Sequence, residues 1–132
     1  MAQQGLGWLV EKQIKARRFD KYVGNTGDII PIEQCKNDRM KKDRTICTAF
    51  AHWTYVPSKQ QCLVLDLQGG GGQFTDVEIV TVEESANHFG CGNLGLSSIT
   101  NFFQQHSCNL LCQLLKISAD RPQQRAATAP AD

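Results

Sequence analysis

A group of potential metal ligands near the end of the chain restricts its fold more than any other sequence feature. On a helix, Cys108 and Cys112 are four residues apart and share one face, and His106 can approach them from the helix start. A structural zinc usually has four protein ligands, and His52, set among apolar residues, is the fourth candidate. The pattern predicts a Cys2His2 zinc site that ties the middle of the chain to its end. The alternative is two buried cysteines beside a surface histidine, because this spacing is not that of a standard zinc finger.

Length and composition favour one small domain. A chain of 132 residues has room for one hydrophobic core, and its formal net charge of +1 does not indicate a nucleic-acid or membrane partner. No apolar run approaches the roughly 18 residues of a membrane-spanning helix, and the N-terminus does not resemble a signal peptide. We therefore expect an intracellular, cytoplasmic protein whose six cysteines favour metal binding over disulfides.

Apolar spacing predicts the elements of the first half of the chain. Residues 8–14 and 19–23 are expected as short strands, and a turn follows the second at 24–28. The charged stretch 37–44 is an exposed loop or a helix start. A helix over 45–55 should bury one face, because apolar residues recur there at steps of three and four: Ile46, Cys47, Phe50, Ala51 and Tyr55.

The second half of the chain contains its most apolar stretch. Residues 62–67 predict a buried central strand, and residues 78–83 predict another strand. A helix after Gly95 and its continuation should bury a set of large apolar side chains: Leu94, Ile99, Phe102, Phe103, Leu110, Leu111, Leu114, Leu115 and Ile117. After Ser118 the sequence has low complexity, and we expect a disordered tail over 118–132.

One carboxylate lies inside the apolar run. Asp66 needs a partner there, because an unpaired buried charge costs several kcal/mol, and that partner is either an arginine or lysine or a metal ion. Gln68 and the glycines at 69–72 are expected to leave the strand as a loop. If that loop folds back, Asp66, Gln68 and Asp76 offer the oxygen ligands that magnesium prefers.

A second glycine-rich stretch, at residues 90–95, has the form Gly-x-Gly-x-x-Gly. This form alone is weak evidence for a phosphate-binding turn. A dinucleotide-binding fingerprint opens a strand-turn-helix unit near the start of a parallel domain, whereas this stretch comes late and leads into the last helical region.

Four motifs occur in a fixed order along the chain. They are Ala-Phe-Ala-His-Trp-Thr-Tyr at 49–55, Asp-Leu-Gln-Gly at 66–69, Thr-Asp at 75–76, and Phe-Gly-Cys-Gly-Asn-Leu-Gly at 89–95 followed by Phe-Phe-Gln-Gln-His-Ser-Cys-Asn-Leu-Leu-Cys at 102–112. Together they resemble the alpha-kinases, atypical serine/threonine protein kinases that include elongation-factor-2 kinase, myosin heavy chain kinases and channel-kinases. Weaker likeness at 9–11 and 19–25 extends the resemblance over about residues 8–117.

The resemblance implies an α+β fold: the C-terminal lobe of a protein-kinase-like domain over 8–117, with a small mixed sheet, helices and one structural zinc, after an N-terminal extension at 1–7. It implies a kinase that transfers the γ-phosphate of ATP to Ser or Thr of a protein substrate. The zinc ligands implied are His52, His106, Cys108 and Cys112. Four protein ligands leave the metal no open position for an activated water.

The same resemblance assigns roles around the acidic residues. Asp66 matches the catalytic aspartate, and Gln68 and Asp76 match the magnesium ligands that bridge to ATP. Lys21 and Asn25 match residues at the phosphate end of the cleft, and Glu11 matches the hinge beside adenine. The remaining matches form a loop near the peptide substrate: Gly90, Gly92, Asn93 and Gly95.

The chain also departs from the family pattern. Val77 follows Asp76 where the family usually has proline, and the chain begins at about the hinge, so the N-terminal lobe has no counterpart in it. One alternative is therefore a catalytically inactive, zinc-stapled interaction module or pseudokinase fragment. Another is an incomplete piece of a longer kinase, and a dimer or a lobe supplied by another chain would also complete the cleft.

Overall fold

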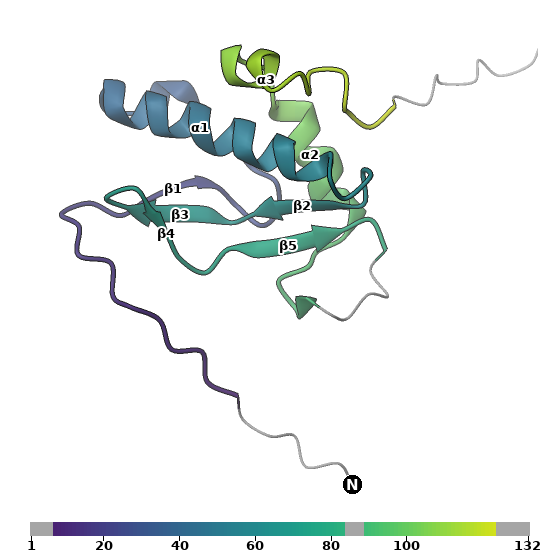
Figure 1. Cartoon of the computed structure of the whole chain (residues 1–132). Coiled ribbons are helices and arrows are strands. Elements are labelled where there is room, and N and C mark those ends of the chain that lie inside the picture. The colour runs from purple at the N-terminus through teal and green to yellow at the C-terminus, as the bar shows by residue number, and fades with distance from the viewer. Residues whose placement is uncertain (1–6, 84–88, 124–132) are drawn as a thin grey trace, which may run out of the picture.

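Two small antiparallel sheets and three α-helices make up the computed structural model, which describes residues 7–83 and 89–123 (Figure 1). The first sheet has the strand order β1 (Asp20–Val23), β3 (Leu67–Gly70), β4 (Gln73–Phe74), and the second pairs β2 (Cys62–Leu65) with β5 (Glu78–Thr81). The helices are α1 (Asp38–Tyr55), α2 (Leu96–Gln105) and α3 (Leu110–Leu114), and a 3-10 turn, η1, spans Ile32–Gln34. The α+β class is confirmed, but every strand pair among the described residues is antiparallel, so the expected mixed sheet is wrong.

The predicted central strand over 62–67 is broken at Asp66. Asp66 has a positive φ of 56°, in the left-handed region that aspartate tolerates better than most residues. The residues before it pair with β5 and those after it pair with β1, so one residue connects the two sheets.

Helix α1 begins earlier than its apolar spacing predicts. Asn37 caps it, because its side-chain oxygen accepts a hydrogen bond from the amide of Met40 at 2.9 Å. The helix then buries the side toward the sheets through Met40, Cys47, Ala51 and Tyr55. The expected burial of Ile46 and Phe50 is wrong: both are exposed on another side of the helix.

One hydrophobic core joins α1, α2 and both sheets. Its completely enclosed apolar side chains come from all of these elements: Val23, Ala51, Leu63, Leu65, Leu67, Val80, Ile99 and Phe102. Burial of each such side chain stabilises the fold by about 1.5–3 kcal/mol. The predictions of strands at 19–23 and 78–83 and of a helix after Gly95 are confirmed by β1, β5 and α2.

Two other expectations in the first 80 residues are wrong. Residues 8–14 form no strand, and Trp8, at 87% exposure, contributes nothing to the core, since no neighbouring strand pairs with this segment. The glycines at 69–72 do not all belong to a loop. Gly69 and Gly70 pair with β4, and the turn of the resulting hairpin lies at Gly71 and Gly72, which both have positive φ.

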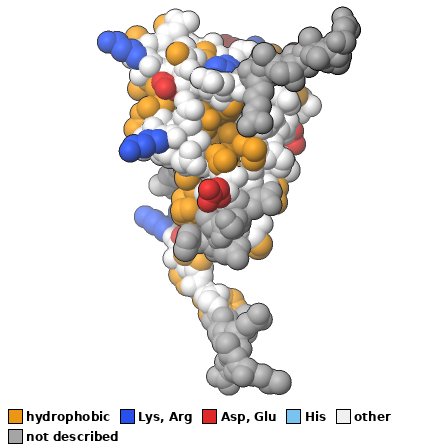
Figure 2. All heavy atoms as spheres, turned by 90° about the vertical axis from the view of Figure 1, so that its right-hand side faces the viewer, with side chains coloured by type: hydrophobic (Ala, Val, Ile, Leu, Met, Phe, Trp, Pro, Cys, Tyr) orange, Lys and Arg blue, Asp and Glu red, His pale blue; other side chains and the backbone are white. Residues whose placement is uncertain are grey.

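The C-terminal region also differs from its prediction. Cys108 precedes α3 instead of sharing a helix face with Cys112, because Asn109 caps α3 and receives the amides of Leu111 and Cys112. Leu110, Leu114 and Leu115 are exposed, although Ile117 is buried. Figure 2 shows hydrophobic side chains on the surface of the side turned toward its viewer.

The first residues of the expected tail make contacts with the rest of the chain. Asp120 and Arg121 contact residues of the α1 and α2 region, whereas residues 124–132 and the extension at 1–6 lie outside the described part of the chain. Among the described helices, none has the length and apolar character needed to cross a membrane.

Gly27 provides a test of the turn that docks on α2. It has a φ of 86°, and a Cβ added there would lie 2.2 Å from the backbone oxygen of Ser98. We expect Gly27→Ala to lower the free energy of unfolding by about 2–5 kcal/mol, through backbone strain and overpacking. Urea denaturation measures this.

Gly72→Ala is the matched control. Gly72 has a φ of 76°, but an added Cβ would meet nothing within 4 Å. Its expected cost is the backbone strain alone, about 1–2 kcal/mol. Equal losses in the two variants would mean that the contact between the turn and α2 is not tight.

Candidate functional site

The four predicted metal ligands meet between α1 and the segments around α3. His52 comes from α1, His106 follows α2, Cys108 lies in the connection, and Cys112 comes from α3. Their candidate ligand atoms all lie within 4.8 Å of one another. The chain therefore brings together, from two regions far apart in sequence, the donor set that the sequence predicted.

The spacing of these atoms suits a tetrahedral zinc. Zn–N bonds of about 2.0–2.1 Å and Zn–S bonds of about 2.3 Å place neighbouring ligand atoms roughly 3.3–3.8 Å apart. His52 Nδ1 lies 3.1 Å from His106 Nε2 and 3.7 Å from Cys108 Sγ. Cys112 Sγ lies 3.5 Å from His106 Nε2. Two imidazoles and two sulfurs in this arrangement are a donor set for zinc.

The surroundings keep the two imidazoles in the form that binds metal. Burial lowers the pKa of His52 and lowers the pKa of His106 to about 3, so both rings are neutral near neutral pH. His52 Nε2 lies 2.7 Å from the backbone oxygen of Asp120. A proton on Nε2 would be donated to that oxygen, which leaves Nδ1 unprotonated and directed at the other ligands.

Asp66 stands at the centre of a second, polar group of residues. It is 8% exposed, and its Oδ1 lies 2.5 Å from Nζ of Lys21 on β1. Its other oxygen, Oδ2, accepts a hydrogen bond from the amide of Gln68 at 3.1 Å. Of the two partners left open by the sequence, the structure shows the lysine. The structure brings Asp66, Lys21 and Gln68 together.

Two further carboxylates lie near Asp66. Asp76 follows β4, and Glu78 begins β5, opposite Leu65. Burial, and then the charges of Asp76 and Asp66, raise the pKa of Glu78. Glu78 was not among the site residues predicted from the sequence. A signal for it was present, since Glu78 opens the predicted strand at 78–83, two residues after a predicted magnesium ligand.

The glycine-rich loop at 90–95 is attached to β5 by Asn93. The side chain of Asn93 accepts hydrogen bonds from the amides of Thr81 and Gly95 at 3.0 and 3.1 Å, and it donates to Thr81 Oγ1 at 2.7 Å. Gly90 and Gly95 have positive φ, which favours glycine at both ends of the loop.

Gly92 connects this loop to the acidic group. A Cβ at Gly92 would lie 2.2–2.3 Å from the carboxylate of Glu78, so only glycine allows this approach. The backbone oxygen of Gly92 also receives a long contact, 3.5 Å, from the side-chain amide of Asn25. The loop and Asn25 therefore lie at one side of the Asp66 group.

Glu11 lies at another side of the Asp66 group. Thr75, next to Asp76, donates a hydrogen bond from its hydroxyl to Oε1 of Glu11. The structure thus brings the predicted site residues together in two places: the His/Cys cluster, and a polar group that includes Glu11, Lys21, Asn25, Asp66, Gln68, Asp76 and the 90–95 loop.

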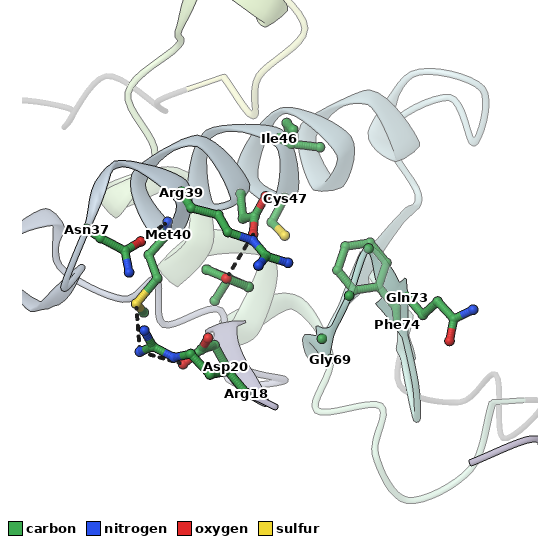
Figure 3. A pocket seen from close by; sticks show the side chains of 15 residues that line it. Arg18, Asp20, Asn37, Arg39, Met40, Ile46, Cys47, Gly69, Gln73 and Phe74 are labelled. Carbon is green, nitrogen blue, oxygen red and sulfur yellow. Dashed lines mark hydrogen bonds and ion pairs between the residues drawn. The ribbon is translucent and has the colours of Figure 1, made fainter. Parts of the chain in front are cut away.

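A pocket of about 310 Å³ lies between α1 and the first sheet, and it contains none of these predicted residues (Figure 3). Asp20 and Tyr22 line it, whereas Lys21 between them pairs with Asp66. Since side chains alternate along a strand, the pocket lies on the opposite side of β1 from Asp66. Its charged side chains pair within its wall: Arg18 with Asp20, and Arg39 with Asp43.

Known proteins are similar to this chain in sequence. Residues 2–112 match the model of a family described as the Alpha-kinase family. Transient receptor potential cation channel subfamily M member 7 of Rattus norvegicus is 38% identical over an alignment of 114 residues, which covers 83% of this chain and 6% of that protein. Eukaryotic elongation factor 2 kinase of Mus musculus is 35% identical over 101 residues, which are 76% of this chain and 12% of that protein.

Solved structures of alpha-kinase domains are also similar to this chain. The apoenzyme alpha-kinase domain of myosin-II heavy chain kinase A matches with a TM-score of 0.65 and 32% identity, over 80% of this chain and 37% of the other. The complex of the myosin heavy chain kinase A domain with ADP matches with a TM-score of 0.62 and 34% identity, over 76% and 36%. The chain thus spans about a third of these solved kinase domains.

Cys112→Ser tests the metal centre. The free energy of metal binding is folding energy in a site of this kind. We expect the variant to lose bound zinc and at least about 3 kcal/mol of stability, roughly a 10 °C drop in Tm. Metal analysis and thermal unfolding with and without a chelator measure both effects.

Cys91→Ser is the control, because Cys91 is exposed and outside the cluster. It should keep both the zinc content and the Tm of the parent chain. A Cys112→Ser protein with the stability of the Cys91→Ser protein would contradict a structural zinc.

Proposed function

Because the chain belongs to the alpha-kinase family, we propose that it forms the C-terminal lobe of a protein kinase that transfers the γ-phosphate of ATP to Ser or Thr. The observation that carries this proposal is the meeting of Asp66, Lys21 and Gln68 beside the glycine-rich loop. Its activity, substrate and partners are proposed, since the chain spans 37% of a solved kinase domain.

Asp66 is proposed to orient the substrate hydroxyl and to accept its proton. It is buried, fixed by Gln68, and held at the junction of both sheets, so its carboxylate has a defined position. Phosphoryl transfer depends mainly on positioning and on compensation of charge. A residue whose backbone is held from two sides is suited to that task.

Gln68 and Asp76 are proposed to hold magnesium, which would neutralise charge on the phosphates of ATP. Their amide and carboxylate oxygens are the donors that magnesium prefers. The raised pKa of Glu78 supports a cation here, because it reflects the negative potential of Asp66 and Asp76 as well as burial. Lys21 and Asn25 are proposed at the phosphate end, and Glu11 at the adenine side.

His52, His106, Cys108 and Cys112 are proposed to bind a structural zinc. With four protein ligands, that zinc has no part in phosphoryl transfer. The loop of Gly90, Gly92, Asn93 and Gly95 is proposed to bind the protein substrate. An intracellular, cytoplasmic location, the domain limits 8–117 and a second lobe or dimer partner that completes the cleft remain predictions.

A non-catalytic, zinc-stapled interaction module is the second candidate function. The observation that favours it is the exposed segment at Trp8, Leu9 and Val10, whose apolar side chains contact little of the described chain. A module of this kind would keep the zinc site and bind neither magnesium nor ATP.

The test combines nucleotide binding with phosphotransfer. We expect the 132-residue chain to bind Mg-ATP in calorimetry, and we expect Asp76→Asn to weaken binding by at least about tenfold through loss of a metal ligand. Asp66→Asn should lower transfer to a protein substrate by about 10²–10⁴-fold, the usual contribution of a general base. Asparagine keeps the size of the side chain and also tolerates positive φ.

Asp38→Asn is the matched control, because Asp38 is an exposed residue of the first turn of α1. It should leave both measurements unchanged. A folded, zinc-containing chain that binds no Mg-ATP would favour the interaction module over the kinase.

A further inference from the structure

We propose that Arg121 is a positioning residue of the metal centre, which holds the backbone around His106 and Cys108 in the arrangement that binds zinc. Arg121 lies beyond the resemblance recognised in the sequence and outside the region matched by the family model, which ends at residue 112. The inference concerns the metal centre alone and does not depend on kinase activity.

The guanidinium of Arg121 bridges two backbone carbonyls at the end of α2. Its Nη2 donates to the oxygen of Phe103 at 2.6 Å and to the oxygen of His106 at 2.8 Å. The last carbonyls of a helix have no partner within the helix, and positive charge is favourable there. Arg121 thus fixes the chain at the point where α2 ends and the ligand segment begins.

The same side chain also contacts the sulfur of one ligand and the aromatic ring that packs on another. Its Nη1 lies 3.7 Å from Sγ of Cys108, a distance at which an N–H can donate to sulfur. Its Cζ lies 5.5 Å from the centre of the Phe103 ring, in a cation–π arrangement. Phe103 in turn meets the ring of His52 edge-on at 5.2 Å. One arginine therefore restrains His106 and Cys108 directly and His52 through Phe103.

The residue before Arg121 completes this arrangement. The backbone oxygen of Asp120 lies within hydrogen-bond distance of His52 Nε2, so two consecutive residues contact the ring of one ligand, the backbone of a second and the sulfur of a third. Among the described residues, Arg121 forms no ion pair with a carboxylate. Its hydrogen bonds are directed at the carbonyls and the sulfur of the metal centre.

Zinc affinity of Arg121→Ala, measured by competition with a chromophoric chelator, tests the proposal. Loss of groups that orient metal ligands typically costs 10–100-fold in metal affinity, and we expect a loss in that range. Arg39→Ala removes the same charge from an exposed position about 20 Å earlier along α1 than His52, and it should leave the affinity unchanged. Affinity within threefold of the parent chain in Arg121→Ala, or an equal loss in both variants, would overturn the proposal.

Arg121→Lys keeps the test valid if Arg121→Ala does not fold. Lysine retains the charge but lacks the planar fork that serves two carbonyls at once, so we expect zinc affinity below that of the parent chain. Replacing zinc with cobalt gives a second measurement, since its visible absorption reports ligand geometry. A shifted spectrum in folded Arg121→Lys supports positioning by the guanidinium. An unchanged spectrum together with unchanged affinity would reduce Arg121 to a general structural role.

Discussion

The cluster of two histidines and two cysteines holds the C-terminal part of this chain on α1. Among the described residues, that part also makes a small apolar contact, in which Ala49, Cys112 and Ile117 are buried together, and hydrogen bonds from Asn109 to α1 and from Arg121 to the end of α2. A shared metal ion would join residues more than 50 positions apart in the sequence and restrict the unfolded chain as a crosslink does. Helix α2, which lies between the two in the sequence, is held by the main core through Ile99 and Phe102, and the turn that contains Gly27 rests on it.

The acidic group obtains its order from the sheets instead. β1 supplies Lys21, β3 supplies Gln68, and β5 supplies Glu78, so three strands direct polar side chains to one place. The glycine-rich loop reaches that place because Asn93 binds β5 and because Gly92 has no side chain to collide with Glu78. The arrangement is typical of a site in which binding groups are fixed before the ligand arrives.

The meeting of the two histidines and two cysteines, the α1 helix and the grouping of residues around Asp66 could be predicted, because ligand chemistry, apolar spacing and family motifs each leave a local signal. The break of the strand at Asp66 could not be predicted, because an apolar run does not show which of its residues has a positive φ angle. Trp8 and Leu110 were assigned to elements by hydrophobicity alone, but burial requires a neighbour to pack against. Glu78 and Arg121 were hard to predict from the sequence for a related reason. Glu78 lies against the glycine-rich loop, and Arg121 donates hydrogen bonds to backbone carbonyl groups, and both are tertiary contacts.

The left-handed backbone at Asp66 has a mechanical consequence. Because this residue is the direct covalent joint between β2 and β3, a rotation about its two backbone torsions would swing one sheet against the other. Lys21 and Glu78, on different sheets, would then move apart even if neither strand changed internally. The torsion angles of Asp66 therefore help to set the distance across the polar group, together with the second connection between the sheets at residues 75–77 and the core packed on both sheets.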